Sequence, residues 1–233
     1  MRAREDRAAR PALFPFLSER PEPMPFRLLQ LADSAFPTGG YAHSSGLEAA
    51  VQLGEVPDIR SHVEEALRQA AYTVLPFVRD AHASPARLAE IDLRNEAFLL
   101  SHVARRASRA QGRALVATAA RTFDGPEIAA WDRQVRSGAL RGHLAPMTGA
   151  VCGAAGLSAR DTLVLALHTS ARGLLSAAVR LGKLGPLEAQ RIHAGLPLEA
   201  LLSEVPEAPA QTAPLHEIFG ALHDGLYTRL FQS

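Results

Sequence analysis

Apolar residues recur three or four positions apart along most of this chain, which is the spacing of amphipathic helices. The pattern is clearest after Asp58, a residue type that often caps a helix start. Charged residues there lie opposite the apolar ones, which are Ile59, Val63, Ala66, Leu67, Ala70, Ala71, Val74 and Val78. No segment alternates β-branched and polar residues between turns. The pattern therefore predicts an all-α fold, a single-domain bundle of roughly eight to ten helices.

Proline and glycine mark where these helices begin and end. Pro76 is expected to kink or end the helix that starts after Asp58, and Pro85 to open the next one. Further helices are expected over residues 86–122 (one or two), at about 127–136, from Pro146, from Ser158 to near Gly182, at 187–195 and from Pro214. The Pro-rich residues 205–214 are expected to form a loop.

Two of these helices have unusual faces. The helix expected from Pro146 carries small residues that let a neighbour approach closely, namely Gly149, Ala150, Gly153 and Ala154. The last helix is apolar at Leu215, Ile218, Phe219, Leu222, Leu226 and Leu230. His216 and His223 lie two turns apart on it, about 10 Å by the helical rise, which is too far for both to hold one ion.

Composition and charge narrow the function classes. Residues 1–25 are rich in proline and arginine without helical periodicity, and we expect a mobile arm before one all-helical domain at residues 26–233. The net charge of +1 does not favour a nucleic-acid partner. The single cysteine, Cys152, excludes an internal disulfide framework and a cysteine-rich metal site.

The chain also lacks the signs of membrane attachment. Its most apolar window, residues 162–181, carries His168, Arg172 and Arg180, which a membrane-spanning helix tolerates poorly. Residues 1–25 have no apolar core of a signal peptide. We therefore expect a cytoplasmic protein without membrane contact.

The stretch from residue 28 to residue 54 predicts a helix, a tight turn and a second helix that begins near Leu47. Pro37 fixes φ at the turn, and the glycines at positions 39 and 40 permit positive φ. Tyr41, His43 and Ser44 follow, and Ser44 or Ser45 is positioned to cap the second helix. The turn thus brings an aromatic, an imidazole and a hydroxyl group together.

Motifs of catalysis and nucleotide binding match this sequence poorly. A phosphate-binding loop needs G-x-x-x-x-G-K-[ST], but the only Gly-Lys pair, Gly182-Lys183, is followed by Leu184. His43 and Ser44 lack the spacing of a hydrolase nucleophile elbow, and adjacent His and Ser side chains rarely converge as base and nucleophile. The nine histidines are scattered without the spacing of metal ligands.

One polar stripe stands out on the most apolar helix. His168, Arg172, Ser176 and Arg180 follow at four-residue steps and share one face. Their neighbours are apolar nearly all round, which is typical of a central helix. The stripe either faces bulk solvent or lines a subunit contact or a water-filled passage, because buried polar groups need partners.

The turn region is one of three segments that carry a family resemblance. The others are residues 176–191 (SAAVRLGKLGPLEAQR) and 226–233 (LYTRLFQS). In this order they resemble the signatures of the urease accessory protein F (UreF) family. Ser108, Arg109, Gln111 and Gly112 also fit, so the similarity spans about residues 27–233.

This resemblance implies an all-helical, dimeric chaperone of urease that is not an enzyme. It implies binding to the accessory protein UreD/UreH and recruitment of the nickel-carrying GTPase UreG to apo-urease for nickel insertion. No cofactor is expected in this chain, because the complex handles the nickel. The candidate partner-binding residues are Phe36, Pro37, Gly39, Gly40, Tyr41, His43, Ser44, Gly46, Glu48, Arg172, Ser176, Arg180, Gly182, Gln190, Arg191, Tyr227, Arg229 and Phe231.

Two other functions stay open at this point. A small helical hydrolase would use His43 and Ser44. A generic helical scaffold would need no chemistry of its own. Turnover of a small molecule without partners would favour the hydrolase, whereas co-purification with UreD/UreH and UreG would favour the chaperone.

Overall fold

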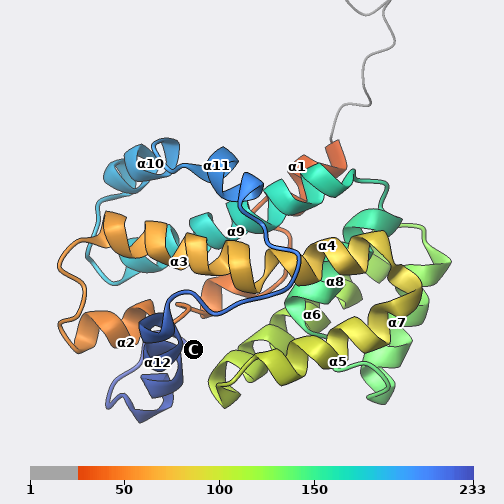
Figure 1. Ribbon diagram of the computed structural model, residues 1–233, viewed down its shortest axis with the longest axis horizontal. Helices are drawn as coiled ribbons and strands as arrows, with labels where there is room; N and C mark the ends of the chain where they lie inside the picture. Colours follow the sequence, from red (N-terminus) through yellow and green to blue (C-terminus); the bar gives the residue numbers. More distant parts are fainter. Residues whose placement is uncertain (1–25) are drawn as a thin grey trace, which may run out of the picture.

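A computed structural model describes residues 26–233 and has twelve α-helices and three short 3-10 helices there (Figure 1). No strand occurs in these residues, which confirms the all-α bundle. The expected arm at residues 1–25 lies outside the described residues. The elements are α1 Phe26–Ala32, η2 Gly40–Ala42, α2 Leu47–Gln52, α3 Ile59–Thr73, α4 Leu75–Ala83, η3 Pro85–Arg87, α5 Leu88–Phe98, α6 His102–Thr122, α7 Pro126–Ser137, α8 Leu144–Ala154, α9 Ala159–Arg180, α10 Pro186–Ala194, α11 Leu198–Ser203, α12 Pro214–Leu222 and η4 His223–Gly225.

Helix α9 is the central element, as its apolar sequence predicts. Ser158 caps it by accepting a hydrogen bond from the backbone N–H of Asp161 at 3.0 Å. Around it pack α1, α2, α3, α4, α8, α10 and α11 (Figure 1). Among the described residues α9 alone is long and apolar enough to cross a membrane, but half of its apolar window is buried inside the fold. Its apolar character therefore serves the protein core.

Helices α4 and α8 approach each other closely through small residues. A Cβ atom added at Gly149 would lie 2.1 Å from the backbone oxygen of Val78, so only glycine fits there. Gly153 packs against the ring of His82, whose Nε2 is 2.9 Å from the backbone oxygen of Leu157. The small-residue face is thus a tight crossing, although α8 begins at Leu144 rather than at proline.

A buried polar cluster fixes the start of α8. Both carboxylate oxygens of Asp92, on α5, accept hydrogen bonds from the backbone N–H groups of residues 141–143 at 2.6–3.0 Å. His143 pairs with Glu96 at 2.6 Å and with the hydroxyl of Ser108 at 3.1 Å. Burial lowers the pKa of His143, which is fully enclosed. The cluster joins α5, α6 and α8.

The helix expected after Asp58 ends at Thr73, as Pro76 predicts, but Pro76 then takes the first turn of a separate, unexpected helix, α4, that continues to Ala83. Two further expectations need correction. Helix α11 was not expected; it is held by Leu201, which is 2% exposed. The last helix stops at Leu222, so Leu226 and Leu230 lie outside it. These divisions explain why the structure has more helices than the pattern predicted.

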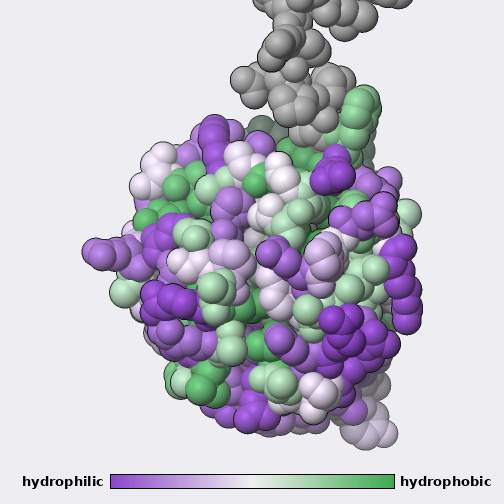
Figure 2. All heavy atoms as spheres, turned by 90° about the vertical axis from the view of Figure 1, so that its right-hand side faces the viewer, coloured by the Kyte–Doolittle hydropathy of each residue, from purple (hydrophilic) through white to green (hydrophobic). Residues whose placement is uncertain are grey.

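The surface differs between the two ends of the bundle. The end that carries α7 mixes hydrophilic and hydrophobic residues without one large apolar patch (Figure 2). At the other end, α12 lies against α2 and the chain finishes beside them (Figure 1). Helix α12 has no buried residue, although its sequence is strongly apolar. This end of the molecule therefore holds the candidate site.

Candidate partner-binding surface

The turn after α1 is shaped by residues with positive φ. Gly39 has φ +73°, Gly46 has φ +85°, and Ser45 between them has φ +53°. Gly46 also touches α12, since a Cβ atom there would lie 2.9 Å from the backbone nitrogen of Gly220. Glycine is required at position 46 by both its φ and this close approach.

This turn holds the last residues of the chain. The backbone N–H of Ser44 donates to the backbone oxygen of Ser233 at 2.6 Å, and that of Gln232 donates to Ala42 at 2.8 Å. The Ser44 hydroxyl donates to the same Ser233 oxygen at 3.0 Å. His43 Nδ1 lies 2.6 Å from the Ser233 hydroxyl. Burial, with Arg106 and His223 nearby, lowers the pKa of His43.

Glu48 is a buried carboxylate that binds the C-terminal segment directly. It is 1% exposed. It accepts hydrogen bonds from the backbone N–H groups of Leu230 at 2.5 Å and Phe231 at 3.1 Å, and from His223 Nε2 at 2.9 Å. The hydroxyl of Ser44 accepts a long bond, 3.4 Å, from the backbone N–H of Glu48. Ser44 therefore supports the start of α2, although Gly46 is its N-cap residue.

Arg180 joins the second signature segment to the other two. Its guanidinium donates to the backbone oxygen of Tyr41 and lies 4.2 Å from the ring centre of Phe231. Residues far apart in the sequence thus meet at one place. The three segments of the family resemblance form a single contact network in the folded chain.

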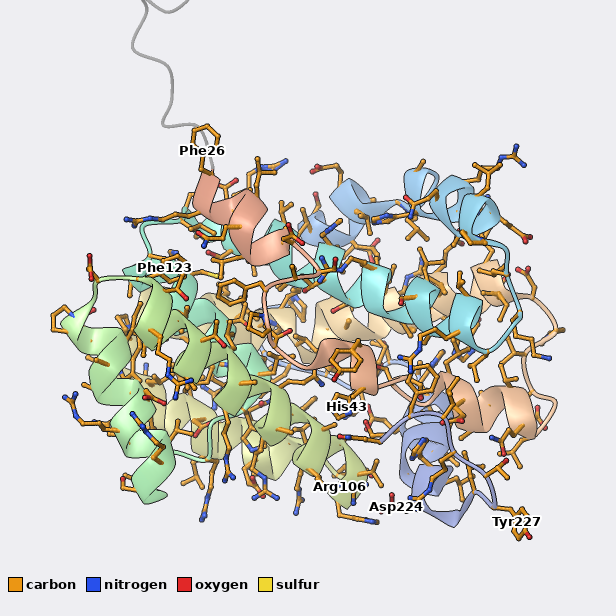
Figure 3. All side chains as sticks on the ribbon, turned by 180° about the vertical axis from the view of Figure 1, so that it is seen from behind. Phe26, His43, Arg106, Phe123, Asp224 and Tyr227 are labelled. Atoms are coloured by element: carbon orange, nitrogen blue, oxygen red, sulfur yellow. The ribbon has the colours of Figure 1, made fainter. Side chains whose placement is uncertain are left out.

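Asp224 connects this network to α6. Arg106 donates to both of its carboxylate oxygens at 2.7 and 2.9 Å, and His102 and Arg229 lie 3.1 and 3.4 Å away. Figure 3 shows His43, Arg106 and Asp224 close together and Tyr227 pointing outward. The hydrogen bond from Arg106 is the main reason that the pKa of Asp224 is far below its usual range.

Helix α12 is attached by polar side chains of α3. The amide oxygen of Gln69 accepts from Thr212 N, Thr212 Oγ1 and Ala213 N at 2.6–2.8 Å. His62 and His216 stack with ring centres 4.5 Å apart. Three apolar residues of the helix point away from the fold, since Leu215, Ile218 and Leu222 are 62%, 50% and 47% exposed, whereas Phe219 is half-buried.

The structure divides the predicted site residues into buried and accessible groups. Ser44, Glu48, Phe36 and Phe231 are buried within their own chain, and Phe36 stacks on Phe123 at 6.2 Å. These four position the site instead of offering a surface for direct contact. The exposed residues are Pro37, Tyr41, Ser176, Arg180, Gly182, Gln190, Arg191, Tyr227 and Arg229. Gly39, Gly40, His43 and Arg172 are half-buried.

The polar stripe on α9 does not form one continuous site. Arg172, Ser176 and Gln190 line a hollow of about 210 Å³ between α9 and α10. Arg172 also donates to the backbone oxygen of Ala32. His168 packs against His193 at 5.1 Å between ring centres. Arg180 lies apart from them, because it belongs to the C-terminal network.

Sequence reasoning missed several residues of this site. Gln69, His62, Arg106 and Asp224 were not singled out. Each binds a partner more than 100 positions away along the chain. The only local signal was the pair His216 and His223. His216 lies on α12 and faces His62, whereas His223 lies beyond that helix, in η4, and binds Glu48.

The described residues offer limited chemistry. His43 and Ser44 bind separate atoms of Ser233, with no hydrogen bond between their own side chains among the described contacts. Within residues 26–233, no three His, Cys, Asp or Glu side chains are placed to hold a metal ion. The arrangement is suited to positioning chain segments and presenting a surface.

Comparison with known proteins identifies relatives over most of the chain. Residues 57–197 match the profile of the UreF family. The chain is 35% identical to "Urease accessory protein F" of Oryza sativa subsp. japonica over 215 residues, covering 87% of this chain and 82% of that protein. It is 34% identical to the Arabidopsis thaliana protein of the same name, covering 88% and 90%. It is 32% identical to "Urease accessory protein UreF" of Mycobacterium sp. (strain JLS), covering 88% and 97%.

Proposed function

This chain belongs to the UreF family of urease accessory proteins, and on this premise we propose that it is an adaptor without catalytic activity. It binds the accessory protein UreD/UreH. Together they recruit the nickel-carrying GTPase UreG to apo-urease, where nickel is inserted. The chain works in the cytoplasm as a homodimer, and the nickel is held by other members of the complex.

The observation that carries this proposal is the outward apolar face of α12. Leu215, Ile218 and Leu222 lie at positions i, i+3 and i+7 and are all about half exposed or more. A helix normally turns such a face toward the core, and an exposed apolar surface is typical of a contact with another protein. The helix is held by polar contacts on its other side, which leaves the apolar face free for UreD/UreH.

Substitution of this face tests the proposal. We expect the double variant Ile218→Glu with Leu222→Glu to lose co-purification with UreD/UreH by at least about tenfold, because an interface centre tolerates buried charge poorly. The fold is expected to persist, since neither side chain is buried. Circular dichroism and size-exclusion chromatography check this.

Exposed leucines elsewhere provide the matched control. Leu93 on α5 and Leu187 on α10 are 58% and 67% exposed, and their change to glutamate is expected to leave co-purification unchanged. Urease activation is measured with the same variants. If the α12 variant co-purifies like the unmodified chain, then α12 is not the docking helix. If the unmodified chain fails to bind UreD/UreH, the adaptor role itself is wrong.

A further inference from the structure

The contact between α12 and α3 contains two stacked histidines in an unusual environment. The rings of His62 and His216 are 4.5 Å apart and tilted by 49°. His62 is 8% exposed, and the side chain of His216 is 10% exposed. His62 Nε2 is fully enclosed and has no hydrogen-bond partner among the described residues. Such a pair is stable as two neutral rings, because two imidazolium ions at this distance would repel each other.

The charged groups around the pair favour protonation of one ring only. Glu65 on α3 lies 3.6 Å from His216 Nε2, and Glu217 on α12 also faces His216. Within residues 26–233, His62 forms no ion pair with a carboxylate. Burial and the neighbouring His216 lower the pKa of His62 to about 4, and burial lowers that of His216 in spite of the two carboxylates.

The other elements packed on α12 carry charges that are already paired. Glu48 of α2 binds His223, and His102 and Arg106 of α6 bind Asp224, all at the far end of α12. The loop before α12 contributes Gln211 and Thr212, which are uncharged and bind Gln69. The histidine pair is therefore the titratable contact between α3 and the start of α12.

We propose that protonation of the His62–His216 pair favours release of α12 from α3, so that mildly acidic conditions increase the fraction of molecules in which the helix with the docking face is free. This inference rests on the proposed function for the role of α12, but the release itself is a property of the single chain. Released α12 loses the Gln69 contacts and the stacked rings, together with its packing against α2 and α6, including the close approach of Gly220 to Gly46. The rest of the bundle keeps its core, because α12 contributes no buried residue to it.

The sign of the pH dependence follows from proton binding. Above pH 6.5 both the attached and the released state have a neutral His62. Below pH 6.5 His62 binds a proton in the released state, whereas in the attached state it binds one only near pH 4. Between pH 7.5 and 5.5 the released population is therefore expected to rise about tenfold, because almost all of the change falls in the one pH unit below 6.5.

Hydrogen exchange of the purified full chain tests this. Protection factors of amides in α12, corrected for intrinsic exchange, are compared with those in α7 at pH 7.5 and 5.5. We expect the α12 protection factors to fall about tenfold in the unmodified chain. The double variant H62Q/H216Q is expected to show no such fall. His168→Gln changes the other stacked pair, which does not touch α12, and is expected to retain the fall.

Each outcome decides the matter. An unmodified chain with equal α12 protection at both pH values, or a fall that persists in H62Q/H216Q, overturns the proposal. If H62Q/H216Q does not fold, an NMR titration of the imidazole groups in the unmodified chain replaces it: a His62 that titrates near pH 6.5 with α12 attached overturns the proposal, and one that stays neutral below pH 5 supports it. Neither experiment contains UreD/UreH, so the adaptor role is judged separately by co-purification at pH 7.5.

Discussion

Replacement of Glu48 by alanine provides the sharpest test of how the C-terminal segment is held. The carboxylate accepts from three donors, which are Leu230 N, Phe231 N and His223 Nε2 at 2.5–3.1 Å. Each buried donor left without an acceptor costs about 1–3 kcal/mol. The three together would cost at least about 3 kcal/mol while the segment stays in place.

Local opening of the C-terminal segment avoids this cost. If the segment from His223 to Ser233 leaves the surface, water satisfies the three donors. We therefore expect Glu48→Ala to open this segment locally while the helices stay folded. A loss of about 3 kcal/mol corresponds to about a hundredfold rise in the open population.

Native-state hydrogen exchange measures this change at the amides of Leu230 and Phe231. Their protection is expected to fall about a hundredfold in Glu48→Ala and much less in Glu48→Gln, which keeps one acceptor oxygen. Glu55, which is exposed and lies just after α2, supplies the control substitution Glu55→Ala. Unchanged exchange at both amides in Glu48→Ala would refute the conclusion that this carboxylate holds the segment.

Three further predictions follow from single positions. Gly149→Ala is expected to lower the free energy of unfolding by about 1–3 kcal/mol through its clash with Val78, whereas Gly173→Ala, with open space around it, is expected to raise it by about 0.5–1 kcal/mol. Urea unfolding followed by circular dichroism measures both. An unchanged free energy of unfolding in Gly149→Ala would contradict the close crossing. Burial raises the pKa of the Cys152 thiol to about 12, so iodoacetamide at pH 8 is expected to modify it only after unfolding in urea. Mass spectrometry measures the labelling, and rapid labelling of the folded chain would contradict this burial. Arg180→Ala is expected to weaken UreG recruitment and urease activation because Tyr41 and Phe231 lose their shared contact. Arg121→Ala, at an exposed position, is the control. Normal UreG recruitment and urease activation in Arg180→Ala would exclude a role of Arg180 in partner binding.

The sequence predicted those parts of the fold that local chemistry determines. The helix that Ser158 caps and the break before Pro126 lie where expected, because caps and prolines act on their own neighbours. The central place of α9 followed from its apolar residues. The family resemblance was confirmed by the match of residues 57–197 to the UreF profile and by the relatives over most of the chain.

Long-range polar contacts were beyond such reasoning. Glu48 lies in the first turn of a helix, where a carboxylate usually faces water. Its partners some 180 positions away are backbone N–H groups, which every residue except proline has, so residue types could not reveal the contact. The sequence did not indicate a role for Gln69 either, since its partners Thr212 and Ala213 lie 143 and 144 positions away. The outward apolar face of α12 could not be predicted either. Apolar periodicity predicts that a helix face is buried, but it does not say whether the face is buried in its own chain or against another protein.

The contact of Asp92 with the start of α8 has a consequence for folding cooperativity. Helix α8 has no side-chain cap of its own, and the carboxylate that holds the residues leading into it comes from α5, 49 to 51 positions earlier. Neither helix can therefore reach its final stability before the other arrives. We expect α5 and α8 to gain and lose structure as one cooperative unit.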